Sequence, residues 1–174
     1  MSPPVLADAD LLPPRYAMAA LGMPRTSWQA LDRRGQLGAG FYGSVAAGGR
    51  RLFTRRGFLA LALVRAMSER KIEVAELSPD ACIRWADLWL RARGAEKPIR
   101  ELWVRYYGRP GDPDATISLL PNADVLRNGP PAPGAQVTIV FDLDQIFGRA
   151  ERTLRELLAS PGDPVEVFDL PDAG

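Results

Sequence analysis

A glycine-rich segment between residues 38 and 49 constrains the fold of this 174-residue chain more than any other feature of its sequence. Glycine weakens helices, so no stable helix is expected to cross this segment. The same segment contains Phe41, Tyr42 and Val45, residue types that favour strands. We therefore expect a flexible β-hairpin here, with helices on either side of it.

Two short helices are expected before the hairpin, between residues 15 and 37. Gly22-Met23-Pro24 separates them, because glycine ends helices and proline suits the first turn of the next one. Thr26 or Ser27 can cap the second helix, and Gly35 is expected to end it.

Two longer helices are expected after the hairpin. Thr54 is a suitable N-cap for the first of them, whose apolar residues run from Phe58 to Met67 in a wide stripe. Such a stripe is typical of a helix at the centre of a core. The second helix is expected over residues 79–93.

The chain beyond residue 94 predicts a small sheet followed by a helix. Strands are expected over residues 102–107, 116–120 and 137–141, with turn-forming residues between them. Asp144 is expected to cap an amphipathic helix that ends near Ala159. The predicted fold class is therefore α+β.

Charge divides the chain into a basic half and an acidic half. Residues 1–72 carry 11 arginine or lysine residues against four acidic ones, whereas residues 73–174 carry 11 against 17. A basic half of this kind favours binding to a polyanion. The chain contains no histidine, the commonest general base and metal ligand, and its single cysteine cannot form an internal disulfide. We expect no enzymatic activity, no cofactor and no metal site.

The order of the N-terminal elements predicts a winged helix-turn-helix over residues 15–93. In that architecture the second helix enters the major groove of DNA, and the hairpin follows the backbone beside it. Arginine and glutamine on such a helix can contact base edges, while arginines near the hairpin can contact phosphates. The residues expected to bind DNA are Arg25, Thr26, Ser27, Gln29, Arg33, Arg34, Arg50, Arg51, Arg55 and Arg56.

These residues resemble the MerR family of DNA-binding proteins. One segment is similar to that family's recognition helix in its length and in the glycines that bound it. This segment ends at Gly35 and reads Gly-Met-Pro-Arg-Thr-Ser-Trp-Gln-Ala-Leu-Asp-Arg-Arg-Gly. Gly-Arg-Arg-Leu-Phe-Thr54 resembles its wing-to-helix segment, and residues 59–64 fit its next helix. The resemblance covers residues 15–90 and implies a transcriptional regulator. It does not imply metal sensing, since the family's sensing cysteines are missing and Cys82 stands alone.

Two strings resemble enzyme motifs without the context that those motifs need. Residues 38–43 match G-x-G-x-x-G, but a helix is expected before them where a dinucleotide site needs a strand. Asp142 and Asp144 follow an apolar strand, as in the opening motif of the haloacid dehalogenase-like phosphatases. The later lysine and acidic motifs of that family do not follow, so we interpret Asp142 as a polar strand end and Asp144 as a helix cap.

Together these features predict a sequence-specific transcriptional regulator that binds double-stranded DNA as a homodimer on an inverted repeat. The module over residues 98–160 is expected to mediate dimerisation or to contact another protein, such as RNA polymerase. A flexible arm over residues 1–14 and a flexible tail over residues 161–174 complete the expected organisation. The side chains expected at the dimer or partner interface are Trp85, Trp89, Phe147 and Leu154.

Two other functions remain open from the sequence. A phage-type excisionase or the small subunit of a packaging terminase would use the same winged architecture without regulating transcription. Alternatively, the acidic half is a module for binding a protein partner such as a polymerase. The sequence shows neither a signal peptide nor an apolar stretch of membrane-spanning length, so a cytoplasmic, nucleoid-associated location is expected.

Overall fold

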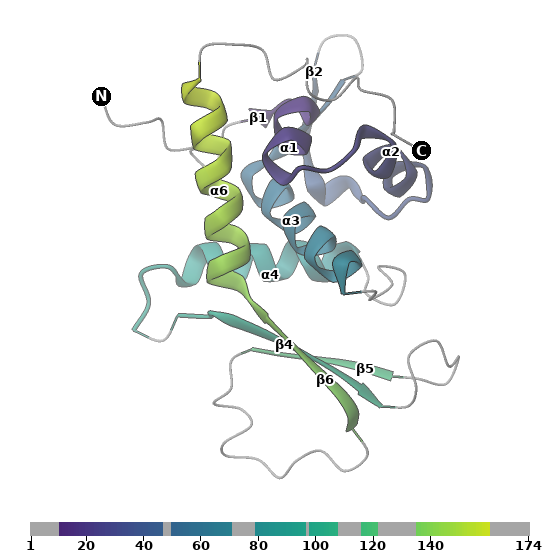
Figure 1. Cartoon of the computed structure of the whole chain (residues 1–174), viewed down its shortest axis with the longest axis vertical. Coiled ribbons are helices and arrows are strands. Elements are labelled where there is room, and N and C mark those ends of the chain that lie inside the picture. The colour runs from purple at the N-terminus through teal and green to yellow at the C-terminus, as the bar shows by residue number, and fades with distance from the viewer. Residues whose placement is uncertain are drawn as a thin grey trace.

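The computed structural model of the chain describes residues 11–46, 50–70, 79–96, 98–107, 116–121 and 135–160. These residues form an α+β fold, as predicted, with helices and two three-stranded antiparallel sheets (Figure 1). One sheet comes from the N-terminal half and the other from the C-terminal half, and they lie at opposite ends of the molecule.

The N-terminal sheet contains the predicted hairpin. β2 (Tyr42–Ala46) pairs with β3 (Arg50–Thr54), and residues 47–49 lie outside the described part of the chain. β1 (Leu11–Leu12) pairs with the other edge of β3, which gives the strand order β1-β3-β2. The sequence alone predicts a flexible arm over residues 1–14, whereas this pairing and the burial of Leu12 order its last residues. Residues 1–10 lie outside the described residues.

Two short helices precede the hairpin, as predicted. α1 (Pro14–Leu21) ends at Gly22, whose φ of 56° is in the left-handed region that glycine adopts without strain. α2 (Arg25–Arg33) follows after a tight turn. Thr26 and Ser27 lie inside α2 rather than at its start, and no side chain caps the helix, so the predicted cap is wrong.

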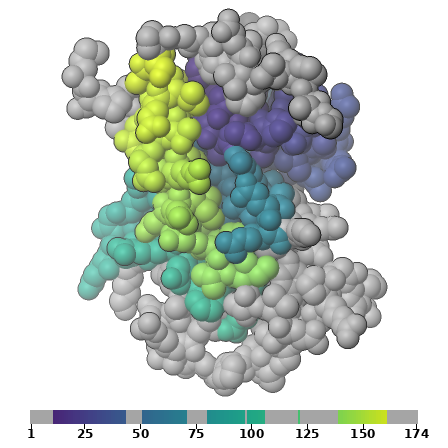
Figure 2. All heavy atoms as spheres, in the orientation of Figure 1, coloured from purple at the N-terminus to yellow at the C-terminus, as the bar shows by residue number. Residues whose placement is uncertain are grey.

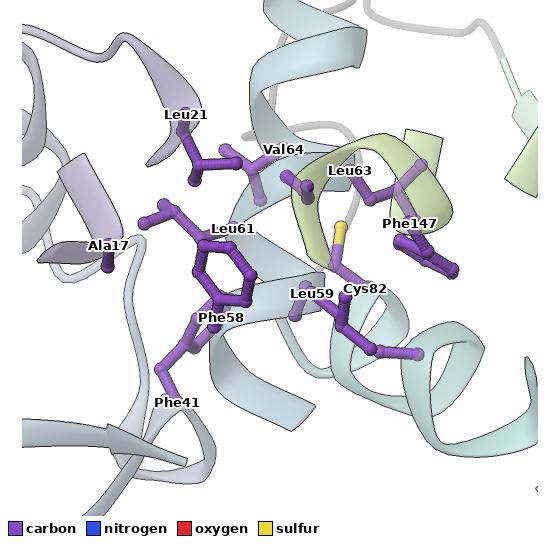
Figure 3. Close-up of a cluster of buried hydrophobic side chains, with 14 of the residues drawn as sticks. Ala17, Leu21, Phe41, Phe58, Leu59, Leu61, Leu63, Val64, Cys82 and Phe147 are labelled. Atoms are coloured by element: carbon purple, nitrogen blue, oxygen red, sulfur yellow. The ribbon is translucent and has the colours of Figure 1, made fainter. Parts of the chain in front are cut away.

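The long helix α3 (Arg55–Glu69) occupies the centre of the molecule. Thr54 caps it as predicted, because its Oγ1 accepts a hydrogen bond from the Gly57 N–H at 2.9 Å. Figure 3 shows the α3 side chains meeting α1 on one side and α4 (Pro79–Ala92) and the C-terminal helix on the other. The 3-10 turn η1 (Ala39–Phe41) packs so closely on α3 that a Cβ on Gly57 would lie 1.9 Å from the Phe41 carbonyl oxygen.

The C-terminal sheet has the strand order β5-β4-β6, and its strands lie within two residues of their predicted positions. β4 (Glu101–Tyr107) is the central strand between β5 (Thr116–Pro121) and β6 (Ala135–Asp142). β6 continues directly into α6 (Leu143–Ala159). Asp142 caps α6 by accepting a hydrogen bond from the Gln145 N–H at 2.8 Å, so the cap predicted at Asp144 is wrong by two residues.

Helix α6 joins the two halves of the chain into one core. It packs against α1 and α3, which are remote from it in sequence, and Figure 2 shows it beside the N-terminal helices. Buried side chains of both halves belong to a single hydrophobic cluster. The sequence predicts separate units over residues 15–93 and 98–160, whereas the described structure shares its core between them. Residues 161–174, the predicted tail, lie outside the described residues.

Across the described ranges, no helix is both long and apolar enough to span a membrane.

Candidate nucleic-acid interface

Helix α2 lies on the surface of the molecule. None of its residues is fully buried, and its apolar contacts come from Trp28 and Leu31, which are half-buried against the core. The opposite side of the helix carries exposed polar side chains. The exposed or half-exposed residues that were predicted to bind DNA from this helix are Arg25, Thr26, Ser27, Gln29 and Arg33.

The C-terminal end of α2 concentrates positive charge. Arg33 is in its last turn and Arg34 follows as the C-cap, and both side chains are exposed. Gly35 then adopts a φ of 67°, so the predicted end of the helix at this glycine is confirmed. Cations at a helix C-terminus are also favoured by the helix dipole, which explains these arginines without any ligand. Their exposure leaves both charges available to an anionic partner.

Asp32 connects α2 to the hairpin. Its Oδ1 accepts a hydrogen bond from the Tyr42 hydroxyl at 3.1 Å and another from the Arg51 guanidinium at 2.7 Å. The Arg51 guanidinium lies over the Tyr42 ring, 5.3 Å from its centroid, and that ring packs on Phe53 at 4.9 Å between centroids. We call the three residues Asp32, Tyr42 and Arg51 the α2–hairpin clasp. The clasp fixes the position of α2 relative to β2 and β3.

The Tyr42 hydroxyl stays protonated in this environment. Burial raises the pKa of Tyr42 above its ordinary value, and the charge of Asp32 and its hydrogen bond to the hydroxyl raise this pKa further. The hydroxyl therefore remains a hydrogen-bond donor to Asp32 at neutral pH. Sequence reasoning missed both residues, although Asp32 is the one acidic residue of α2 in an otherwise basic stretch.

Of the two hairpin arginines, Arg50 and Arg51, only Arg51 has a side chain among the described residues. Arg51 belongs to β3, and its side chain is 51% exposed even though it binds Asp32, so its charge still faces solvent. Arg50 pairs with Ala46 through the backbone, but its side chain lies outside the described residues.

The two arginines that begin α3 do not occupy equivalent positions. Arg55 points inward, where it forms an ion pair with Glu151 of α6, and its side chain is only 13% exposed. This placement differs from the prediction that Arg55 contacts DNA, since a buried ion pair ties it to the core. Arg56 remains 43% exposed, with its nearest ion-pair oxygen on Asp87 at 3.9 Å.

The four residues predicted at a dimer or partner interface are packed within the chain. Trp85 and Trp89 of α4 are 8% and 5% exposed, and Phe147 and Leu154 of α6 are fully buried. Trp89 meets the Phe147 ring edge-on at 5.1 Å and donates its indole N–H to Asp144 at 2.7 Å. This burial within one chain leaves the four side chains little accessible surface for a partner.

A scan against models of known protein families gave no match, and a search of curated protein sequences gave none either. Within the described ranges, no three acidic or cysteine side chains gather in a way that would hold a metal ion. A function for this chain therefore has to be inferred from its own residues.

Proposed function

We propose that this protein is a sequence-specific DNA-binding transcriptional regulator with a winged helix-turn-helix similar to that of the MerR family. The observation that carries the proposal is α2: a surface helix without a fully buried residue, rich in Arg, Ser, Thr and Gln, and fastened to a hairpin through Asp32. A helix that carries polar side chains outward and is hydrogen-bonded to a neighbouring hairpin fits the geometry of a recognition helix with its wing.

In this proposal the start of α2 reads the major groove. Arg25, Thr26 and Ser27 are exposed in its first turn, which is where recognition helices contact base edges. Gln29, half-exposed on the next turn, has the amide geometry that pairs with the edge of adenine. These four residues carry the sequence preference.

Phosphate contacts come from the end of α2 and from the hairpin. Arg33 and Arg34 are exposed after the recognition turns, and Arg51 extends the same positive surface onto β3. The side chain of Arg55 leaves the proposed set, because it pairs with Glu151 in the interior. Phosphate contacts of this kind position the protein and make its affinity depend on salt.

A homodimer on an inverted repeat completes the proposal, because one recognition helix spans only a few base pairs. Dimerisation requires exposed side chains, and the described residues offer Leu88 on α4 and Val140 on β6, which are 42% and 38% exposed. Double-stranded DNA is thus the proposed partner, and the nucleoid the proposed location.

Selection from a library of randomised duplexes tests this function. The wild-type protein is expected to enrich an inverted repeat, and Gln29→Ala is expected to lose its preference at one base pair of each half-site. That loss corresponds to about 1–3 kcal/mol of discrimination. Gln145→Ala is the matched control, since Gln145 is exposed at the start of α6, far in sequence from α2. No enriched sequence, or an identical motif from Gln29→Ala, would contradict the proposal.

A further inference from the structure

A cavity of about 460 Å³ opens between the N-terminus of α3 and the second half of α4. Its size falls in the range of pockets that hold small molecules. The residues that line it are Thr54, Arg55, Arg56, Asp87, Leu90, Arg91 and Arg93. Four of these seven residues are arginines, so the lining is strongly basic.

The inner wall of the cavity is held by one carboxylate. Glu151 of α6 is 10% exposed and binds Arg55 at 2.5 Å through one oxygen and Arg93 at 3.1 Å through the other. The Arg93 guanidinium also stacks over the Trp89 ring at 4.7 Å from its centroid. These interactions fix the position of two guanidinium groups with one negative charge between them.

At the outer wall, another carboxylate lies between two arginines, at longer distances and with more exposure to solvent. Arg91 binds Asp87 at 2.8 Å and is 75% exposed. Arg56 lies 3.9 Å from the same carboxylate, beyond hydrogen-bonding distance, and is 43% exposed. Asp87 therefore balances one of the two charges and leaves the outer guanidinium groups open to a ligand.

The basic lining of the cavity favours an anionic ligand. Among the described residues, the lining contains four arginines and one acidic residue, and Arg56 and Arg91 remain 43% and 75% exposed beside the Asp87 carboxylate that they share. The N-terminus of α3 adds the positive end of a helix dipole, and the Thr54 hydroxyl lies at the same edge. Guanidinium groups bind phosphate in a bidentate manner, which matches this donor set.

We propose that this cavity binds a small phosphate monoester. The phosphate group would lie between Arg56 and Arg91 at the start of α3, and the remaining volume beside Leu90 would hold the organic part. The site is separate from the proposed DNA contacts of α2, and its binding requires no DNA. The phosphate-binding proposal therefore goes beyond the proposed DNA-binding function and can be tested independently of it.

Isothermal titration of the DNA-free protein with ribose 5-phosphate and with inorganic phosphate tests the site at constant ionic strength. We expect saturable binding of both, tighter for the sugar phosphate. Arg91→Gln is expected to raise the dissociation constant about tenfold, because it removes a charge-assisted hydrogen bond. Arg56→Gln should weaken binding in the same way. Neither side chain is buried, since Arg56 is 43% and Arg91 75% exposed, so the fold should tolerate either change.

Arg84→Gln is the matched control, since Arg84 is exposed on the same helix and does not line the cavity. Its dissociation constant should equal that of the wild type. The absence of saturable binding, or an equal loss in Arg84→Gln, would overturn the proposal. It would also be overturned if neither compound bound while Arg91→Gln weakened binding to duplex DNA, because the arginines would then serve a DNA phosphate.

Discussion

Helices α2 and α3 stand on either side of the same hairpin and are built in opposite ways. Nine of the fifteen α3 residues are buried, on every side of the helix, whereas α2 has none that is fully buried. Packing thus dictates most of the α3 side chains. In α2 only Trp28 and Leu31 lie against the core, so the other positions are free to carry binding residues. The difference separates α3, which stabilises the fold, from α2, which we propose recognises DNA.

The contrast also shows how a loosely packed helix is held in place. α2 depends on a few half-buried contacts and on the α2–hairpin clasp, in which Asp32 accepts hydrogen bonds from two hairpin residues. α3 is held mainly by apolar side chains that other helices surround, in addition to the ion pair between Arg55 and Glu151.

The same truncation in the two helices should produce the largest difference. Leu61→Ala in α3 removes a fully buried side chain, and we expect a loss of about 2–5 kcal/mol of unfolding free energy. Leu31→Ala in α2 removes a half-buried side chain and should cost less than half as much. Urea denaturation measures both variants. Equal losses would show that α2 is packed as firmly as α3.

A methyl group added to α3 tests how tightly it packs. Gly57→Ala would place a Cβ 1.9 Å from the Phe41 backbone oxygen, and we expect the forced movement to cost about 3 kcal/mol. Gly148→Ala in α6 is the matched control, because its nearest neighbour is the end of the Arg152 side chain at 3.6 Å. The control should gain about 0.5–1 kcal/mol from helix propensity. A neutral Gly57→Ala would refute the close contact between η1 and α3.

The environment on the far side of α3 predicts a dependence of stability on pH. Cys82 of α4 is fully buried in the cluster of Figure 3, and burial raises the pKa of its thiol from 9.0 to about 12. Above pH 9 the unfolded thiol loses its proton while the folded one keeps it, so stability falls by about 1.4 kcal/mol per pH unit until pH 12.

Cys82→Ala removes this contribution, so its unfolding free energy should fall less between pH 8 and pH 10.5 than that of the wild type. Chemical denaturation at the two pH values measures the difference. Parallel losses in the two proteins would show that the thiol is not buried against α3.

Breaking the α2–hairpin clasp should have the smallest effect on stability. Asp32→Ala removes the acceptor of two partly exposed hydrogen bonds, and we expect a loss of about 1 kcal/mol or less. Glu156→Ala, at an exposed position of α6, should change the unfolding free energy by less than about 0.5 kcal/mol. If the proposed function holds, Asp32→Ala also weakens DNA binding, because α2 is no longer held against the hairpin. Thermal denaturation and a DNA titration measure the two effects.

Local signals predicted much of this structure. Thr54 and Gly35 act through hydrogen bonds and backbone angles within a few residues, so their roles could be predicted from the sequence. The cap of α6 was placed two residues late, because Asp142 and Asp144 are both suitable caps and only the end of β6 decides between them. β1 was missed because two leucines beside prolines give too short a pattern for a strand.

Contacts between distant segments could not be predicted in this way. No local sequence pattern predicts the pairing of Arg55 with Glu151. The neighbouring arginines alone favour the interpretation of Arg55 as a phosphate contact. The apolar stripe of α6 predicted that Phe147 and Leu154 would be covered, but not that helices of the same chain would cover them, as Trp89 of α4 does for Phe147. For the candidate site, the exposure of α2 agreed with expectation, whereas the clasp through Asp32 and Tyr42 needed the three-dimensional structure.

The salt dependence of DNA binding tests the central claim most directly. Fluorescence anisotropy with a labelled duplex should give a straight line of log affinity against log salt concentration for the wild type. Arg33→Ala/Arg34→Ala should weaken binding and flatten the slope by about 0.9 for each DNA phosphate that the variant no longer neutralises. The control Arg149→Ala/Arg152→Ala removes two exposed charges from α6 and should keep the wild-type slope. A slope unchanged by the α2 variant, or equally reduced by the control, would contradict the assignment of α2 and the hairpin as the DNA-binding surface.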